Sequence, residues 1–224
     1  MNRIAAPQFA APERKTSVWL AKPMAGRHAL DQCISVRALV RDSLGLAADT
    51  RETARILQSG EVLLDGKVTR DSKAPIGLMD VVSMPKIGKY YLVLIDKKSR
   101  ILLKTIDKAK AGSKLCKIMG KHSAQGGKAQ LSLHDGRTLL ADNSYRVGDT
   151  VKLKLPECTI MGALRLEPGA RCLIVRGKHA GVVARLKEVM KGSETLDAKA
   201  VLDAEGKEQI ITLKNYLFVV GDEI

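Results

Sequence analysis

The chain is poor in aromatic residues and has no long apolar run. Only 3% of its 224 residues are Phe, Trp or Tyr. Proteins that hold single-stranded nucleic acid stack bases on such rings, so we expect any polyanion to be bound through phosphates and folded shape. No segment approaches the roughly 18 consecutive apolar residues of a membrane-spanning helix, and the polar, proline-broken N-terminus is unlike a signal peptide. These absences predict a cytoplasmic chain without a membrane partner.

Cysteine is scarce and scattered. The four cysteines, Cys33, Cys116, Cys158 and Cys172, form no CxxC pair, and no histidine stands at zinc-finger spacing from a close cysteine pair. In a reducing compartment they are expected to be small buried hydrophobic residues. We therefore predict neither a metal site nor a disulfide.

Motifs of catalysis are also missing. The stretch GKHSAQGGK at residues 120–128 resembles a phosphate-binding loop, but His122 and Ala129 stand where that loop needs a glycine and a hydroxyl residue. A flexible basic hairpin tip is the expected structure instead. The pair His134-Asp135, followed by glycine, is a turn signal rather than an acid–base pair. We predict no catalytic residue, no cofactor and no small-molecule substrate.

Positive charge is abundant and concentrated. The net charge is +14, which favours a polyanionic partner. Residues 97–128 hold ten lysines and arginines against Asp107 alone. A membrane surface would call for a basic amphipathic helix with bulky apolar residues, and none is visible. We expect this stretch to contact a polyanion; its candidate residues are Lys114, Lys117, Lys121 and Lys128.

Two short helices are predicted near the N-terminus. Residues 34–44 place Val36, Val40 and Leu44 four apart, and residues 50–59 follow Asp49, a plausible N-cap, and end at Gly60. Each helix also carries two arginines four residues apart, which places both on one face. These are either ordinary surface arginines or a basic binding surface.

Short strands follow. Residues 61–70 read as a hairpin around Asp65-Gly66, and further strands are expected at 80–85, 90–95, 128–133, 150–156, 171–189, 198–213 and 216–220. Residues 1–30 look like an irregular arm, which Trp19, the only tryptophan, is expected to hold on the body. The predicted fold class is α+β, mainly β.

Three blocks carry a resemblance to one family. Residues 27–85, with GEVLLDGKVTRD and LMDVVSM, resemble an S4-type RNA-binding unit. Residues 114–156, KLCKIMGK to VGDTVKLKLP, are similar to the central β domain of the archaeal and eukaryotic ribosomal protein S4e family. RCLIVRGKHAGVVARL looks like a KOW motif with Gly177 and Gly181 in its loop. The resemblance covers roughly residues 3–222.

The resemblance implies a layout and a function. It implies an N-terminal arm (1–30), an S4-type RNA-binding domain (31–96), a central small β domain (97–167) and a C-terminal KOW SH3-like barrel (168–224). It implies a structural constituent of the small ribosomal subunit that binds ribosomal RNA, neighbours other small-subunit proteins and supports assembly and translation. The residues carried over as RNA contacts are Arg37, Arg41, Arg51, Arg55, Lys67, Arg70, Lys73, Arg176, Lys178 and His179.

Two departures and two alternatives stand beside this interpretation. The family usually has a strongly basic extension ahead of the AAP stretch, where this chain has only Met1-Asn2-Arg3, so fewer N-terminal RNA contacts are expected. The chain stops soon after the last expected strand, which favours an archaeal-type member. The alternatives are an RNA-modifying enzyme that uses the S4-type unit to bind RNA, and a KOW-containing factor that visits the ribosome transiently.

Overall fold

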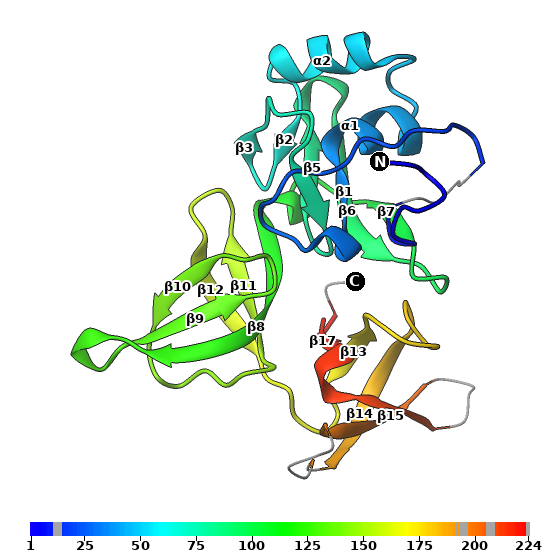
Figure 1. Ribbon diagram of the computed structural model, residues 1–224. Helices are drawn as coiled ribbons and strands as arrows, with labels where there is room; N and C mark the ends of the chain where they lie inside the picture. Colours follow the sequence, from blue (N-terminus) through cyan, green and yellow to red (C-terminus); the bar gives the residue numbers. More distant parts are fainter. Residues whose placement is uncertain (11–14, 191, 193–196, 205–208, 223–224) are drawn as a thin grey trace. The chain divides into compact units, whose positions relative to one another are not determined.

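The computed structural model describes residues 1–10, 15–190, 192, 197–204 and 209–222 (Figure 1). Contacts within the chain divide it into two compact units. Unit 1 comprises Met1–Ile95, Arg100–Lys114 and Lys154–Thr159, and unit 2 comprises Asp96–Ser99, Leu115–Leu153 and Ile160–Ile224. Each unit therefore combines segments that are distant in the sequence.

The described part of the chain is mainly β with few helices, as predicted at the level of fold class. Its helical segments are η1 (Leu30–Gln32), α1 (Val36–Ala38), the π-helical η2 (Leu39–Ser43), α2 (Thr50–Gln58), η3 (Pro85–Ile87), η4 (Lys110–Gly112), η5 (Gln125–Gly127) and η6 (Lys214–Tyr216). None of these has the length or apolar character that crossing a bilayer as a helix requires.

The strands of the N-terminal half are β1 (Cys33–Ser35), β2 (Leu63–Leu64), β3 (Lys67–Val68), β4 (Pro75–Gly77), β5 (Val81–Met84), β6 (Lys89–Ile95) and β7 (Ile101–Thr105). Those that follow are β8 (Ser113–Ser123), β9 (Ala129–Leu133), β10 (Thr138–Ala141), β11 (Thr150–Lys154), β12 (Thr159–Leu164), β13 (Arg171–Ile174), β14 (Val183–Met190), β15 (Lys199–Asp203), β16 (Ile210–Leu213) and β17 (Leu217–Val219).

Both predicted helices form, with local signals setting their ends. The first begins at Val36 rather than residue 34, because β1 takes the preceding residues and the Ser35 hydroxyl accepts a hydrogen bond from the Ala38 N–H at 3.3 Å. Helix α2 begins after Asp49, whose carboxylate accepts from the Glu52 N–H at 2.7 Å. Gly60 follows the helix with a φ of +74°.

The sheet of unit 1 has the strand order β3-β2-β5-β6-β7, and β1 pairs separately with β4. The predicted hairpin is confirmed: β2 and β3 are antiparallel with Leu63 opposite Val68. Its two turn residues, Asp65 and Gly66, have φ values of +52° and +75°, as a type I′ turn requires. Strands β5 and β6 are largely buried and form the middle of the sheet.

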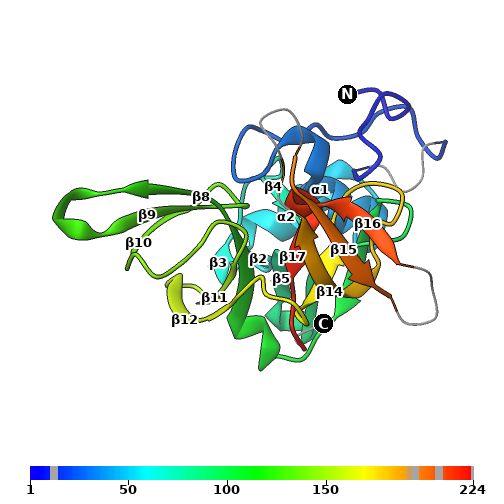
Figure 2. The same cartoon turned by 90° about the horizontal axis from the view of Figure 1, so that it is seen from below.

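The first sheet of unit 2 has the order β10-β9-β8-β11-β12. Strands β8 and β9 form a long hairpin that pairs from Ile118 opposite Leu133 to Ser123 opposite Ala129, with a β-bulge between Ile118 and Gly120 (Figure 2). The predicted hairpin tip at residues 120–128 therefore exists, and its flexibility stays a prediction. Strand β8, like β7, lies within the basic stretch 97–128, where no strand was predicted because its lysines obscure the apolar alternation.

The second sheet of unit 2 has the order β16-β15-β14-β13-β17. Its core uses alternate residues of each strand: Cys172 and Ile174, Ala184 and Leu186, Ala200 and Leu202, and Leu217 and Val219. Because side chains alternate between the two faces of a strand, the side chains on one face of this sheet pack together and form the hydrophobic core. The expected strands at 171–189, 198–213 and 216–220 are confirmed in their described parts; residues 191, 193–196 and 205–208 lie outside the description.

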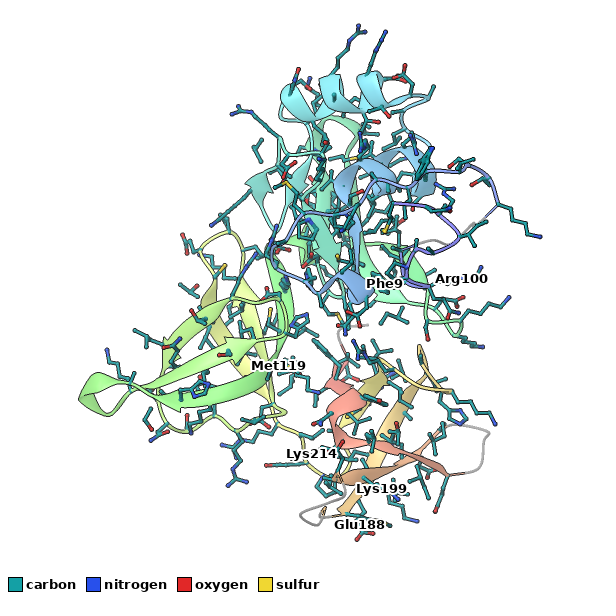
Figure 3. All side chains as sticks on the ribbon, viewed as in Figure 1. Phe9, Arg100, Met119, Glu188, Lys199 and Lys214 are labelled. Atoms are coloured by element: carbon teal, nitrogen blue, oxygen red, sulfur yellow. The ribbon has the colours of Figure 1, made fainter. Side chains whose placement is uncertain are left out.

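Trp19 does not hold the N-terminal arm on the body, contrary to the prediction from the sequence. Its side chain is 68% exposed, whereas the neighbouring Leu20 is 4% exposed. Met1 and Leu20 exchange two backbone hydrogen bonds of 2.9 Å, and Asn2 bridges Trp19 antiparallel. On this short ladder Leu20 packs into the protein, whereas the Trp19 side chain faces solvent. Phe9, labelled in Figure 3 and 6% exposed, helps fix the arm through its carbonyl, which accepts from the Ile101 N–H.

Candidate nucleic-acid interface

Helix α2 presents its two arginines on one exposed face. Arg51 and Arg55 are both exposed, and neither forms an ion pair within the described chain. Thr53 and Leu57 are buried on the opposite side of the same helix, because residues two apart on a helix lie about 200° apart. The face that carries the arginines is therefore left to solvent or to a partner.

The arginines of the first helical segment, α1 and η2, are less exposed than those of α2. Arg37 and Arg41 are only half-buried, and the Arg41 guanidinium donates to both carboxylate oxygens of Asp42, at 2.6 and 3.2 Å. This hydrogen bond raises the pKa of Arg41. Asp42 also forms an ion pair with the buried Arg3 of the arm. The charge of Arg41 is thus shared with a carboxylate, and the two predicted arginine pairs are not equivalent.

The three predicted cations of the first hairpin and its exit are all exposed. Lys67 lies on β3, and Arg70 and Lys73 follow it. Residues 71–73 form a turn in which the Asp71 carboxylate accepts from the Lys73 N–H at 2.8 Å. The hairpin thus places three cations on the surface within seven residues.

Lys114 corrects the sequence prediction. It is 2% exposed, and its ammonium lies 3.0 Å from Asp65 Oδ2 and 2.5 Å from Asp80 Oδ1. Both carboxylates are buried as well, and a buried charge needs such partners. Lys114 therefore balances charge inside unit 1 and is not available to RNA.

The same buried cluster contains two residues that sequence reasoning missed. His28 lies with Nε2 2.9 Å from Asp80 Oδ2, and the Arg27 guanidinium lies 2.6 Å from Asp65 Oδ2. Burial opposes ionisation of Asp80, but the charges of Lys114 and His28 outweigh it and hold the pKa of that carboxyl below its usual range. No local pattern in the sequence predicts this cluster, because the partners of each ion pair are far apart along the chain and Asp65 is already accounted for as a turn residue.

Lys117 is the second correction. It is 7% exposed, and its ammonium donates to the Asn215 carbonyl at 2.7 Å. Burial lowers the pKa of Lys117 to about 8. This lysine, too, serves the interior of its unit and does not form part of a basic surface.

The other predicted lysines of the basic stretch lie nearer the surface. Lys121 is half-buried and donates to the carbonyls of Asn143 and Tyr145, at 2.7 and 3.0 Å. Lys128 is exposed beside the hairpin tip. Five exposed lysines of the same stretch were not singled out from the sequence: Lys97, Lys98, Lys104, Lys108 and Lys110. The excess charge of the stretch therefore does reach the surface, but largely through other residues.

The glycine-containing loop between β13 and β14 is built around two left-handed glycines. Gly177 and Gly181 have φ values of +93° and +77°. A Cβ at Gly181 would lie 2.6 Å from the carbonyl carbon of Asp96, so only glycine fits there. Between the glycines, Lys178 is exposed and His179 half-buried, and the preceding Arg176 is exposed.

Cys116, His134 and Asp135 bring potential ligand atoms within 4.8 Å of one another. Within the group, Cys116 Sγ lies 3.7 Å from Asp135 Oδ2, whereas His134 Nδ1 accepts from the Lys117 N–H at 3.3 Å. Asp135 also accepts from the Arg137 N–H at 3.3 Å. These bonds fit the predicted turn at residues 134–137, which connects β9 to β10.

The cysteines lie largely as expected. Cys33, Cys116 and Cys172 are buried, and Cys158 is half-buried. Burial raises the pKa of the Cys33 thiol to about 11 and that of Cys172 to about 12. These two thiols therefore stay protonated near neutral pH and behave as small apolar groups.

Comparison with known proteins gives consistent results. The model of the ribosomal family S4e matches residues 87–160. The small ribosomal subunit protein eS4 of Methanothermobacter thermautotrophicus is 40% identical over 92% of this chain and 85% of its own length. That of Methanosphaera stadtmanae is 40% identical over 100% of this chain and 92% of its own. The crystal structure of the 30S ribosomal protein S4e from Thermoplasma acidophilum is similar with a TM-score of 0.73 and 31% identity, covering 85% of this chain and 96% of that one.

Proposed function

The chain belongs to the ribosomal S4e family, and from this premise we propose that it binds small-subunit ribosomal RNA through exposed basic faces and supports subunit assembly. Its family consists of structural proteins of the small ribosomal subunit and not of enzymes. The relatives named above are archaeal, in keeping with an archaeal-type small subunit. Other small-subunit proteins are its proposed neighbours, and the cytoplasmic ribosome its proposed location.

We propose the four-part layout as follows: an arm at 1–30, an S4-type unit at 31–96, a central β domain at 97–167 and a KOW-type barrel at 168–224. Support for the second part comes from two helical segments and a type I′ hairpin. Support for the last comes from a five-stranded sheet with one closed apolar face and a loop that admits only glycine at residue 181.

The proposed RNA contacts are the exposed cations, so burial revises the set. Lys114 and Lys117 leave it because both are buried and bonded within the protein. Arg41 and Lys121 donate hydrogen bonds to oxygen atoms of the protein, and Arg37 and His179 are half-buried. These four residues are therefore proposed only as secondary RNA contacts. The proposed set is Arg51, Arg55, Lys67, Arg70, Lys73, Lys128, Arg176 and Lys178, joined by exposed lysines of residues 97–110.

The observation that carries the proposal is the arginine face of α2. Arg51 and Arg55 lie on one side of a helix whose other side is buried, and neither has an ion-pair partner among the described residues. Arginine donates through a planar fork that matches phosphate oxygens. Two such groups at helical spacing, on a helix whose other side is buried, offer an RNA backbone a positively charged face without an acidic partner among the described residues.

The test replaces both arginines and measures binding to a transcript of small-subunit ribosomal RNA at several salt concentrations. We expect Arg51→Gln/Arg55→Gln to weaken binding by about tenfold. The slope of log affinity against log salt should become shallower by about 2, because two phosphate contacts no longer release counterions.

The matched control is Lys86→Gln/Arg165→Gln. It removes the same total charge from exposed residues that already pair with Glu61 and Glu167. We expect it to leave the affinity and the salt slope nearly unchanged. Equal effects of the two double variants would show that α2 is not a specific RNA contact.

A further inference from the structure

Trp19 is an exposed aromatic side chain on a fixed backbone. It is 68% exposed, and the adjacent Val18 is 65% exposed. The ladder that holds this segment adds a third bond of 2.9 Å, from the Arg3 N–H to the Val18 carbonyl. An indole on a backbone held in this way loses little freedom when it binds a flat partner. Large apolar groups exposed together commonly mark an interaction site.

Beside Trp19 lies a pocket of about 990 Å³ within unit 1. Trp19, Val18 and Leu102 supply apolar wall, and Arg3, Arg41 and Asp42 supply charge. Two arginines against one aspartate leave the wall with a net positive charge. Ser43 also lines the pocket, and its hydroxyl oxygen is buried without a hydrogen-bond partner among the described residues.

The mixed lining decides what kind of partner fits. An apolar side chain of another protein would remove the arginines and hydroxyls from water without replacing their hydrogen bonds, which is unfavourable. A nucleotide offers an apolar face for the indole, polar edges for hydroxyl and charged groups, and a phosphate for the net positive charge. The lining therefore complements a nucleotide better than an apolar protein segment.

We propose that Trp19 stacks on an unpaired base of small-subunit ribosomal RNA at the mouth of this pocket. The proposal rests on the RNA binding proposed above and adds to it a contact of a different kind. The basic faces bind phosphates and do not select a base, whereas stacking on Trp19 needs a base that is free of its helix. The arm would thereby recognise a single-stranded position within a folded RNA.

The experiment uses the full-length chain and a transcript of small-subunit ribosomal RNA. Trp19 is the only tryptophan, so its fluorescence, excited where tyrosine does not absorb, reports on this site alone. We expect strong quenching at saturation. Trp19→Leu, which keeps apolar bulk, should weaken binding by about tenfold, and Trp19→Phe, which keeps a ring, by at most about threefold. The salt slope of Trp19→Leu should equal that of the wild type, because stacking releases no counterions.

Two comparisons make the result decisive. Ile211→Ala removes an apolar side chain that is similarly exposed, at 62%, on β16, and should bind RNA like the wild type. Equal melting temperatures of all variants would exclude unfolding as a cause. If the wild type binds RNA without quenching and Trp19→Leu binds equally well, the stacking contact is refuted while RNA binding by the basic faces stands. If the wild type does not bind the transcript at all, the proposed function itself fails.

Discussion

At the scale of single residues, the chain has separated its lysines and arginines into two roles. Lys114 lies between the buried carboxylates of Asp65 and Asp80, where its charge stabilises the folded state. Arg51 and Arg55, by contrast, are solvent-exposed and have no acidic partner among the described residues. A positive charge thus balances buried carboxylates at Lys114 and faces solvent at Arg51 and Arg55, where the proposed function assigns it to RNA.

Replacing Lys114 should be costly. Lys114→Met would keep much of the volume but leave two buried carboxylates without their shared cation, which typically destabilises a protein by about 3–5 kcal/mol. Urea unfolding followed by circular dichroism would measure the change. Lys86→Met is the control, because Lys86 pairs with Glu61 while 68% exposed and should be nearly neutral. A loss no larger for Lys114→Met than for this control would contradict the role assigned to Lys114.

At the scale of elements, the loop between β13 and β14 depends on one glycine. Gly181 has a φ of +77°, and a Cβ there would lie 2.6 Å from the Asp96 carbonyl carbon and 2.8 Å from its oxygen. Both the backbone conformation and the lack of space exclude a side chain.

Gly181→Ala should therefore lower the free energy of unfolding by about 2 kcal/mol or more. The control is Gly126→Ala, at a φ of +75° with nothing within 4 Å of the added Cβ. It carries only the cost of the left-handed backbone, about 1 kcal/mol. Similar melting temperatures for the two variants would show that contact with Asp96 does not constrain the loop.

The elements themselves were largely predictable, because their signals are local. Asp49 caps α2, Gly60 follows its end, and Asp65-Gly66 forms the turn that the sequence indicates. Strands β7 and β8 were not predicted, because lysines interrupt their apolar residues, and the short strands β1, β4, β10 and β12 were not predicted either.

Of the candidate site, the arginine spacing on α2 was predictable from helical periodicity. The burial of Lys114 was not, because its partners lie 34 and 49 residues away along the chain. The exposure of Trp19 also depends on a tertiary pairing, with Asn2, which the sequence alone does not indicate.

At the scale of the whole molecule, the net charge of +14 and the family suggest long residence on RNA. A structural constituent should be present at about one copy per small subunit and should remain through a wash at moderate salt, because many phosphate contacts must break together. Sedimentation of extract on a sucrose gradient, with the protein quantified in the small-subunit peak, would measure this. Mostly free protein would favour the factor that visits the ribosome transiently.

The buried cluster also limits how this protein can be divided for study. The proposed S4-type unit ends at residue 96, yet Lys114, which forms ion pairs with two of its buried acids, comes eighteen positions later at the start of β8. A fragment cut at residue 96 would keep both carboxylates with Arg27 and His28 but lose the lysine that the two carboxylates share. A failure of that fragment to fold would therefore say nothing about the intact chain. A fragment extended through residue 114 would keep the charge balance, so the covalent boundary of this module lies beyond the one that its motifs suggest.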